Sequence, residues 1–288
     1  MLLARLTASS FLPGAGDDME RGEKVRAALS AGGEELWTLV REHLPEIILN
    51  ATLNRNLTED MATFIARKKT TPSEALEFLA GDVRFKDSYK LKLALCKNPR
   101  TPQRVIFGNL KFLRIFDLCD LTREQALPLN VRQKIEQVIS ERIPSMPLGV
   151  KTALARRANS TVVTMLLEQG EEAAVKACLD SASLTEGLLF KVINRKSARP
   201  SVIRMIAGHP KWSLRYSVRY ALIRNFNTPM EQVVNFISRM KTADLRDLYA
   251  DPKLPLSTRP FIFNELARRK EDGEAPNEET YTLWEEGE

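Results

Sequence analysis

The chain has 288 residues, of which 43% are hydrophobic and 28% are charged, a balance typical of a folded protein with an ordinary apolar core. Three widely spaced cysteines without a CxxC pair, and only two histidines, argue against a disulfide framework and against thiolate or histidine metal sites. The formal net charge is +6, and no apolar run approaches the roughly 18 residues that a membrane-spanning helix needs.

The charge is distributed unevenly along the chain. Residues 1–60 carry 6 Lys and Arg against 10 Asp and Glu, whereas residues 61–270 carry 37 against 19. Residues 271–288 carry eight acidic residues and no basic one. A basic middle flanked by acidic ends favours an anionic partner for the middle. The cysteine usage favours a reducing, cytoplasmic location.

The first 60 residues divide into two parts. Residues 1–20 contain an apolar stretch that is short and broken by Arg5, so we expect a flexible leader and not a signal peptide. Translation could start at Met1 or at Met19. Residues 21–60 include the amphipathic stretch from Glu34 to Leu53, which is typical of helices that cap the end of an array.

Residues 61–270 contain a recurring joint between helices. The pattern Ala-x-x-x-Asn-x-x-Thr-Pro occurs at Ala94 and again at Ala221. In the second copy, Asn225 is a residue type that tolerates the left-handed conformation at a helix end. Thr228 is expected to cap the next helix, with Pro229 at its first position and Glu231 completing a capping box.

Further copies give the period of the repeat. The joint recurs at Pro72 and Pro102, and weaker copies lie around Asn159 and around Pro200. The interval of 61 residues between Pro102 and Val163 is two periods, and the missing copy falls near Leu127-Pro128. The intervals of 30 to 37 residues each accommodate two helices and two turns. The periodicity between joints is helical, and no convincing strand pair is present. The sequence therefore predicts an all-α fold, an α-solenoid of about six or seven stacked helix pairs.

The run Asn98-Pro99-Arg100-Thr101-Pro102, followed by apolar residues, resembles the bacterial leucine-rich repeat variant and HEAT-like helical repeats. The resemblance covers roughly residues 60–270 and implies a right-handed, curved helical array without a specific activity. The founding variant-repeat proteins carry an iron–sulfur module with clustered cysteines. This chain lacks such a cluster, so we expect neither that cofactor nor any other.

The densest candidate for a binding site runs from His209 to Asn225. On one helix, Lys211, Arg215 and Arg219 would form a cationic stripe beside an aromatic stripe of Trp212, Tyr216 and Tyr220. One interpretation is a cradle in which the aromatic rings stack on bases and the arginines meet phosphates. The other is a helix buried on two sides, whose aromatic residues pack on the next repeat.

Other basic residues in neighbouring helices extend this candidate surface. If one helix of each pair lines the concave face, they form a continuous basic groove suited to an acidic protein or peptide, to nucleic acid or to anionic lipid headgroups. The alternative is that they are ordinary solvated helix residues. The predicted groove residues beyond the 209–225 stretch are Lys92, Arg156, Arg157, Lys191 and Arg195.

The acidic segment 271–288 contains Tyr281, Leu283 and Trp284, and we expect it to be mostly disordered. An aromatic core among acidic residues is typical of a short docking motif. It could also fold back onto the basic groove of the same chain as an intramolecular competitor, or simply solubilise the protein.

No phosphate-binding loop, dinucleotide fingerprint, zinc-protease motif or serine-hydrolase elbow occurs in the sequence. The leading hypothesis is therefore a non-catalytic scaffold that binds an acidic partner. Nucleic-acid binding, largely without sequence specificity, is the first alternative, and a glycosylase-like HEAT enzyme is the second. Exposed Trp212 or Tyr216 would favour nucleic acid, and buried aromatics would favour a protein partner. A pocket holding an aromatic ring and a carboxyl group of raised pKa would favour an enzyme.

Overall fold

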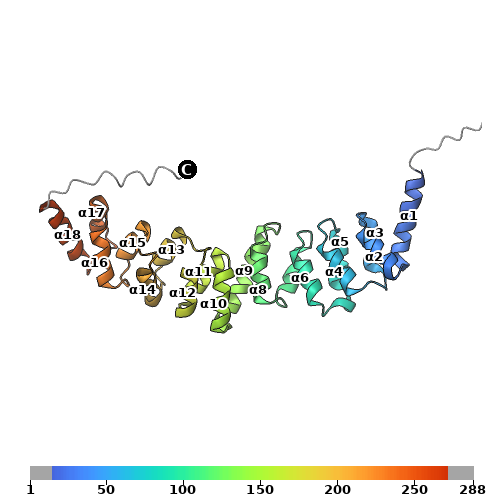
Figure 1. Ribbon diagram of the computed structural model, residues 1–288, viewed down its shortest axis with the longest axis horizontal. Helices are drawn as coiled ribbons and strands as arrows, with labels where there is room; N and C mark the ends of the chain where they lie inside the picture. Colours follow the sequence, from blue (N-terminus) through green and yellow to red (C-terminus); the bar gives the residue numbers. More distant parts are fainter. Residues whose placement is uncertain (1–14, 272–288) are drawn as a thin grey trace, which may run out of the picture. The chain divides into compact units, whose positions relative to one another are not determined.

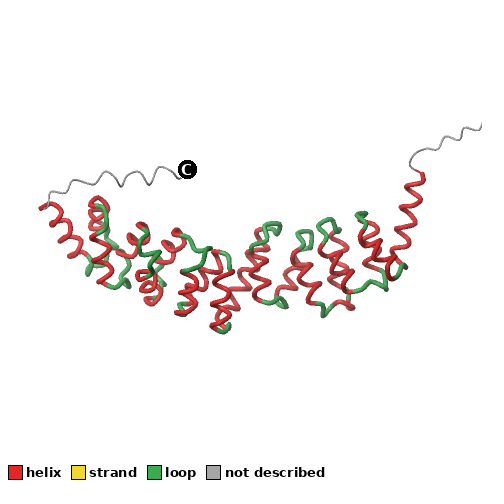
Figure 2. The backbone as a smooth tube through the Cα atoms, viewed as in Figure 1, coloured by secondary structure: helices red, strands yellow, loops and turns green. Residues whose placement is uncertain are grey.

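The computed structural model describes residues 15–271, and side chains within residues 20–270. Over that range all regular structure is helical and no β-strand occurs, which confirms the all-α class (Figure 2). Two short 3-10 helices, η1 (Val83–Phe85) and η2 (Ile143–Ser145), accompany the α-helices. The α-helices are α1 (Ala15–Ser30), α2 (Gly33–Arg41), α3 (Pro45–Leu53), α4 (Glu59–Arg67), α5 (Ser73–Gly81), α6 (Tyr89–Lys97), α7 (Gln103–Leu110), α8 (Ile115–Thr122), α9 (Leu129–Arg142), α10 (Leu148–Arg157), α11 (Ser160–Gln169), α12 (Glu172–Leu179), α13 (Glu186–Ile193), α14 (Pro200–Gly208), α15 (Tyr216–Ile223), α16 (Met230–Ser238), α17 (Thr242–Ala250) and α18 (Arg259–Glu271).

The ends of the chain depart from the predicted boundaries. Helix α1 begins at Ala15, inside the stretch predicted as a flexible leader. The predicted amphipathic stretch from Glu34 to Leu53 is two helices, because Pro45 opens α3 and the residue before a proline disfavours helical geometry. Residues 1–14 and 272–288, which hold the proposed docking motif of Tyr281, Leu283 and Trp284, lie outside the described residues.

The chain divides into two compact units, and the division falls between Val138 and Ile139, within α9. Within each unit most helices pack on a neighbour in sequence, and most also pack on a helix two positions away (Figure 1). In the first unit α1, α3 and α5 form one layer and α2, α4, α6 and α8 form the other. In the second unit α10, α12 and α14 form one layer, and α11, α13 and α15 form the other.

Apolar residues at helical spacing fill the space between the layers. Leu36, Ile47 and Ile65 are fully buried in the first unit, as are Val162 and Leu189 in the second. Burial of such side chains contributes about 1.5–3 kcal/mol each, so packing holds these short helices together where isolated helices of this length would be marginal.

The asparagine of the recurring joint connects successive helix pairs. The side-chain amide of Asn98 donates to the carbonyl oxygens of Ala66 at 2.8 Å and Lys68 at 2.9 Å, and its oxygen accepts the Arg100 N–H at 3.0 Å. Asn225 likewise donates to the carbonyl oxygen of Ile193 at 2.6 Å. The equivalent Asn98 of the first copy does not adopt the left-handed conformation that the sequence suggested for Asn225, since its backbone is extended at φ −84° and ψ 120°. These amides satisfy carbonyl groups at the end of the preceding pair.

The threonine of the joint also differs from its predicted role. The Thr71 and Thr228 hydroxyls donate at 2.6 Å to the carbonyl oxygens of Ile65 and Leu222, so they close the preceding helix and do not cap the next. Pro229 occupies the N-cap position and α16 starts at Met230. The predicted capping box is therefore wrong, because a buried carbonyl at the preceding helix end takes the hydroxyl.

Candidate functional site

The stretch from His209 to Asn225 is not a single helix. Helix α14 ends at Gly208, residues 210–214 form turns, and α15 begins only at Tyr216. The predicted cationic and aromatic stripes are therefore interrupted, and Lys211 and Trp212 do not share a helix with Tyr216. The break occurs where Pro210 cannot supply a backbone N–H to continue a helix.

Trp212 is part of the core. Its side chain is only 3% exposed, and its indole N–H donates at 2.8 Å to the carbonyl oxygen of Leu179, at the end of α12. The Lys211 ammonium covers the ring, 4.2 Å from its centroid. Trp212 offers no ring face on which a base could stack, and Tyr216 is half-buried.

The predicted groove residues are divided among different parts of the fold. In the second unit, Lys191 and Arg219 lie on α13 and α15, which are neighbours in one layer. Arg156 and Arg157 end α10 in the other layer. Arg195 and Arg215 are exposed beyond α13 and ahead of α15, and Arg195 pairs with Glu168. Lys92 belongs to the first unit, where its ammonium lies 4.4 Å from the centroid of Phe112.

Two tyrosine clusters repeat the same geometry, one in each unit. Tyr89 opens α6, and its hydroxyl donates to Asp117 and accepts the Arg114 N–H at 3.1 Å. Tyr216 opens α15, and its hydroxyl donates to Asp244 and accepts the Lys241 N–H at 3.1 Å. The acceptor lies 28 residues after the tyrosine in both clusters, and the donor lies 25 residues after it. Each phenol thus joins its own helix to the N-terminus of the helix two positions on.

The environment of both phenols keeps them neutral. Burial, and then the hydrogen bond to Asp117, raise the pKa of Tyr89. Burial, and then the hydrogen bond to Asp244, raise the pKa of Tyr216 more strongly. A neutral phenol is required for this arrangement, because only the protonated hydroxyl can donate to the carboxylate.

Beside Tyr89 the surface is a basic hollow of about 370 Å³. Arg67, Lys69, Lys90 and Lys97 line it and are exposed, and Glu124 is the single carboxylate among the lining residues. Within the described residues, no ion pair involves Arg67, Lys69 or Lys97, and Lys90 has only a 3.8 Å contact with exposed Asp60. We call this site the basic hollow.

Arg67 and Lys97 stand in the last turns of α4 and α6, where a cation also stabilises the helix end. The carbonyl oxygens of Ala66 and Lys68 already accept from Asn98, which reduces the negative potential that this helix end presents. The surplus of positive charge is therefore available to an anion.

Beside Tyr216 the corresponding surface is an aromatic hollow of about 430 Å³. Phe190, Tyr216 and Tyr220 supply its aromatic lining, and the remaining lining residues are Ser217, Lys241, Ala243 and Asp244. Arg219 lies next to Tyr216 on α15, and burial, followed by the positive charge of Arg239, lowers the pKa of its guanidinium. We call this site the aromatic hollow; Arg219 adjoins its lining residue Tyr220 in the sequence, and the like charge of Arg239 acts on Arg219.

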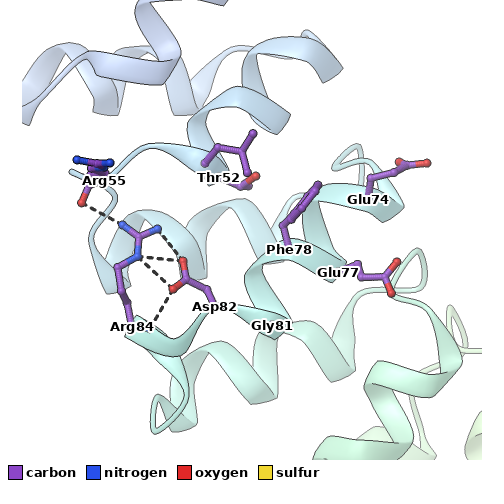
Figure 3. A pocket seen from close by; sticks show the side chains of 9 residues that line it. Thr52, Arg55, Glu74, Glu77, Phe78, Gly81, Asp82 and Arg84 are labelled. Carbon is purple, nitrogen blue, oxygen red and sulfur yellow. Dashed lines mark hydrogen bonds and ion pairs between the residues drawn. The ribbon is translucent and has the colours of Figure 1, made fainter.

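The larger hollow between α3 and α5, of about 690 Å³, has a different character (Figure 3). Its apolar surface comes from Leu53 and Phe78, which are 50% and 51% exposed. Arg84 is occupied, since it pairs with Asp82 and donates to the carbonyl oxygens of Asn54 and Arg55. With Glu74 and Glu77 also lining it, carboxylates outnumber cations, and the site does not suit an acidic ligand.

Among the described residues, the carboxyl groups of Asp82, Asp251 and Glu265 have displaced pKa values, and all three values are lowered. The main causes are the hydrogen bonds from the Arg84 side chain, the Lys253 backbone N–H and the Arg268 side chain, respectively. These carboxylates are therefore anionic at neutral pH.

No family model, curated protein or solved structure matches the chain. Across residues 15–271 no helix is long and apolar enough to cross a membrane. The same residues contain no group of three or more His, Cys, Asp or Glu side chains placed to hold a metal ion.

Sequence reasoning missed most of the residues that line the two hollows. Arg67, Lys69 and Lys97 each look like ordinary cations near a helix end, and Phe190 looks like a core residue. Their positions in the sequence could have indicated a shared site, because these basic residues lie just before Thr71 and Asn98 of two successive joints.

Proposed function

We propose that the protein is a non-catalytic scaffold with an α-solenoid architecture, which binds an acidic segment of a partner protein through the basic hollow. The observation that carries this proposal is the set of four exposed cations at Arg67, Lys69, Lys90 and Lys97 around one carboxylate. Such unbalanced charge attracts and orients an anionic chain.

The packing of helices in each unit supports the architecture. Contacts between neighbouring helices and between helices two apart are those expected of stacked helix pairs. Stacked pairs of this kind present extended surfaces for binding, and loops and helix ends supply the contact residues.

The aromatic residues favour a protein segment over nucleic acid. Stacking on bases requires exposed rings beside the cations, whereas Trp212 is buried and the partly open rings of Phe190, Tyr216 and Tyr220 line a different hollow, in the second unit. The basic hollow also lacks an aromatic ring other than Tyr89. Its cations could still contact phosphates, so nucleic acid is included as an outcome of the test.

The test measures binding of a fluorescent acidic peptide, rich in Glu and Asp, and of a single-stranded DNA of matched charge, across a salt series. The variant Lys69→Glu/Lys97→Glu reverses two charges in the basic hollow. The control Arg55→Glu/Lys86→Glu makes the same net change at exposed positions of the same unit. We expect Lys69→Glu/Lys97→Glu to weaken peptide binding about tenfold at low salt. Each substitution removes an ion-pair contact and adds repulsion, which together cost about 0.5–1 kcal/mol per position.

The control should weaken binding by less than about threefold, because its charges act only at long range. Equal losses in the two variants would show that total charge, and not the hollow, holds the peptide. Binding of DNA in strong preference to peptide would move nucleic-acid binding ahead of the scaffold proposal.

A further inference from the structure

We propose that the aromatic hollow of the second unit is a docking site for the acidic segment that follows α18 in the same chain, with Trp284 as the side chain it receives. The inference concerns the second unit alone and does not depend on the function proposed for the basic hollow. For residues 272–288 it uses only their amino-acid sequence.

The lining of the hollow suits an aromatic side chain flanked by acidic residues. Phe190, Tyr216 and Tyr220 are all half-buried, so each leaves part of its ring open. A volume of about 430 Å³ lies in the range of small-ligand pockets and accommodates one large side chain. Aromatic pairs add to binding beyond the area they bury, because their rings attract one another in edge-to-face and offset-stacked arrangements.

Cations lie in or next to the lining: Lys241 lines the hollow, and Lys191 and Arg219 directly adjoin the lining residues Phe190 and Tyr220 in the sequence. Lys191 is exposed beside Phe190, and Arg239 acts on Arg219 as a like charge. The Nε atom of Arg219 is buried without a hydrogen-bond partner, although its Nη2 atom donates to the carbonyl oxygen of Leu214 at 2.5 Å. A carboxylate that pairs with this guanidinium would offset the repulsion from Arg239 and compensate part of the cost of burying its positive charge.

The second unit up to residue 270 and the segment 271–288 carry opposite net charges. Residues 139–270 hold 22 basic and 11 acidic residues, whereas residues 271–288 hold eight acidic and no basic residues. In that acidic segment, Leu283-Trp284 is followed directly by Glu285-Glu286. The segment thus offers an aromatic side chain for the rings of the hollow and adjacent carboxylates for the cations in and next to its lining.

The chain leaves the described structure close to the hollow. Helix α18 packs on α17, which supplies Lys241, Ala243 and Asp244 to the lining. From α18, Arg269 donates to the carbonyl oxygen of Met240 at 2.7 Å and to the Thr242 hydroxyl at 3.0 Å, the residues on either side of Lys241. Trp284 follows Arg269 by fifteen residues, which span up to about 50 Å when extended. The segment therefore reaches the hollow without strain.

Docking within one chain changes how the hollow responds to other ligands. A tethered segment binds at an effective concentration in the millimolar range when its linker is short and flexible. It therefore occupies the hollow ahead of a similar segment on another molecule, unless that segment binds more tightly or is present at high concentration.

The experiment uses the full-length chain and a labelled synthetic peptide with the sequence of residues 277–288. Affinity is measured for the wild-type chain and for Trp284→Ala, with far-UV circular dichroism as a check on folding. We expect the peptide to bind Trp284→Ala at least tenfold more tightly, because the chain's own segment no longer competes. In the Trp284→Ala background, Tyr220→Ala should then weaken binding by at least tenfold, and Phe78→Ala in the other large hollow should change it less than twofold.

Three results would overturn the inference. The first is equal affinity for the wild-type and Trp284→Ala chains, which would show that the segment does not compete. The second is an undiminished affinity in a folded Tyr220→Ala chain, and the third is no binding to any chain. The variant Lys69→Glu/Lys97→Glu, also made in the Trp284→Ala background, separates this inference from the proposed function. If this variant loses affinity for the peptide and Tyr220→Ala does not, the peptide binds in the basic hollow and not in the aromatic hollow.

Discussion

The tyrosine clusters of the two units have the same framework and different surroundings. Tyr89 and Tyr216 make equivalent hydrogen bonds to a helix N-terminus and its carboxylate. One turn further along the helix, Leu93 in the first unit corresponds to Tyr220 in the second. The next residue after each tyrosine is Lys90 in one unit and Ser217 in the other.

This difference separates the positions that hold the fold from those that set the surface chemistry. The phenol and the joint asparagine satisfy backbone groups, and the carboxylate accepts the hydroxyl hydrogen of the phenol. A change at any of these positions leaves a polar group without a partner. The neighbouring positions differ in chemistry, with Lys90 and Leu93 in the first unit and Ser217 and Tyr220 in the second. One framework therefore supports a basic hollow in the first unit and an aromatic hollow in the second.

The largest expected effect is at the joint asparagine, where the two units differ in burial. Asn98 is 3% exposed and satisfies two carbonyl oxygens and one N–H, whereas Asn225 is half-buried and satisfies one of each. We expect Asn98→Ala to lower the free energy of unfolding by about 3 kcal/mol and Asn225→Ala by about 1–2 kcal/mol.

Urea unfolding measures these losses, and thiol labelling assigns them to a unit. Cys96 in the first unit and Cys178 in the second are buried, and burial raises the pKa of each thiol to about 12, so native chains should label slowly at neutral pH. Asn98→Ala should accelerate labelling of Cys96 and Asn225→Ala that of Cys178. If Asn225→Ala lowered the free energy of unfolding as much as Asn98→Ala or more, burial of the asparagine would not determine the loss of stability.

The next effect is at the phenols. Tyr89→Phe and Tyr216→Phe each remove a donor to a carboxylate and an acceptor for a backbone N–H, and we expect a loss of about 1–2 kcal/mol in each variant. Because folding raises both pKa values, this stabilisation is complete below the pKa of about 10 that an unfolded tyrosine has, and it falls as the pH rises above that value.

Absorbance at 295 nm measures the ionisation, and urea unfolding at pH 8 and pH 11 measures the stability. Tyr216→Phe should remove the part of the tyrosine titration that occurs at the highest pH. Between pH 8 and pH 11 the wild type should lose more free energy of unfolding than this variant does. A titration that is unchanged in Tyr216→Phe would contradict the assignment of the raised pKa.

The smallest effect is expected at Leu93, one helical turn after Tyr89 of the first tyrosine cluster. Leu93→Tyr places in the first unit the residue that Tyr220 supplies in the second, and we expect the free energy of unfolding to change by less than about 0.5 kcal/mol. Unfolding in urea tests this expectation. A loss of 2 kcal/mol or more would show that the surface positions are part of the framework after all.

Much of the local structure could be predicted from the sequence. Helices begin directly after Pro72, Pro102 and Pro229, and the helical class follows from the periodicity between these joints. These features depend on residues within one or two turns of each other, which is the range over which proline geometry and apolar spacing act.

Features that depend on partners distant in sequence could not be predicted. Whether Thr228 caps its own helix or closes the previous one depends on which backbone groups remain unsatisfied after packing. The role of Trp212 depends on a carbonyl group 33 residues earlier in the chain. The basic hollow arises because helix ends that are separate in sequence come together, so each lysine or arginine alone gives no sign of it.

The bridging amides also restrict how such a chain can change its length during evolution. Asn98 and Asn225 each reach back to a carbonyl group 32 residues earlier, at the end of the preceding pair. Adding or removing a few residues inside a helix would move the amide away from its acceptor, whereas duplicating or deleting a whole pair would restore the same bond at the new junction. Changes in the length of this protein should therefore occur in whole helix pairs or in the exposed turns.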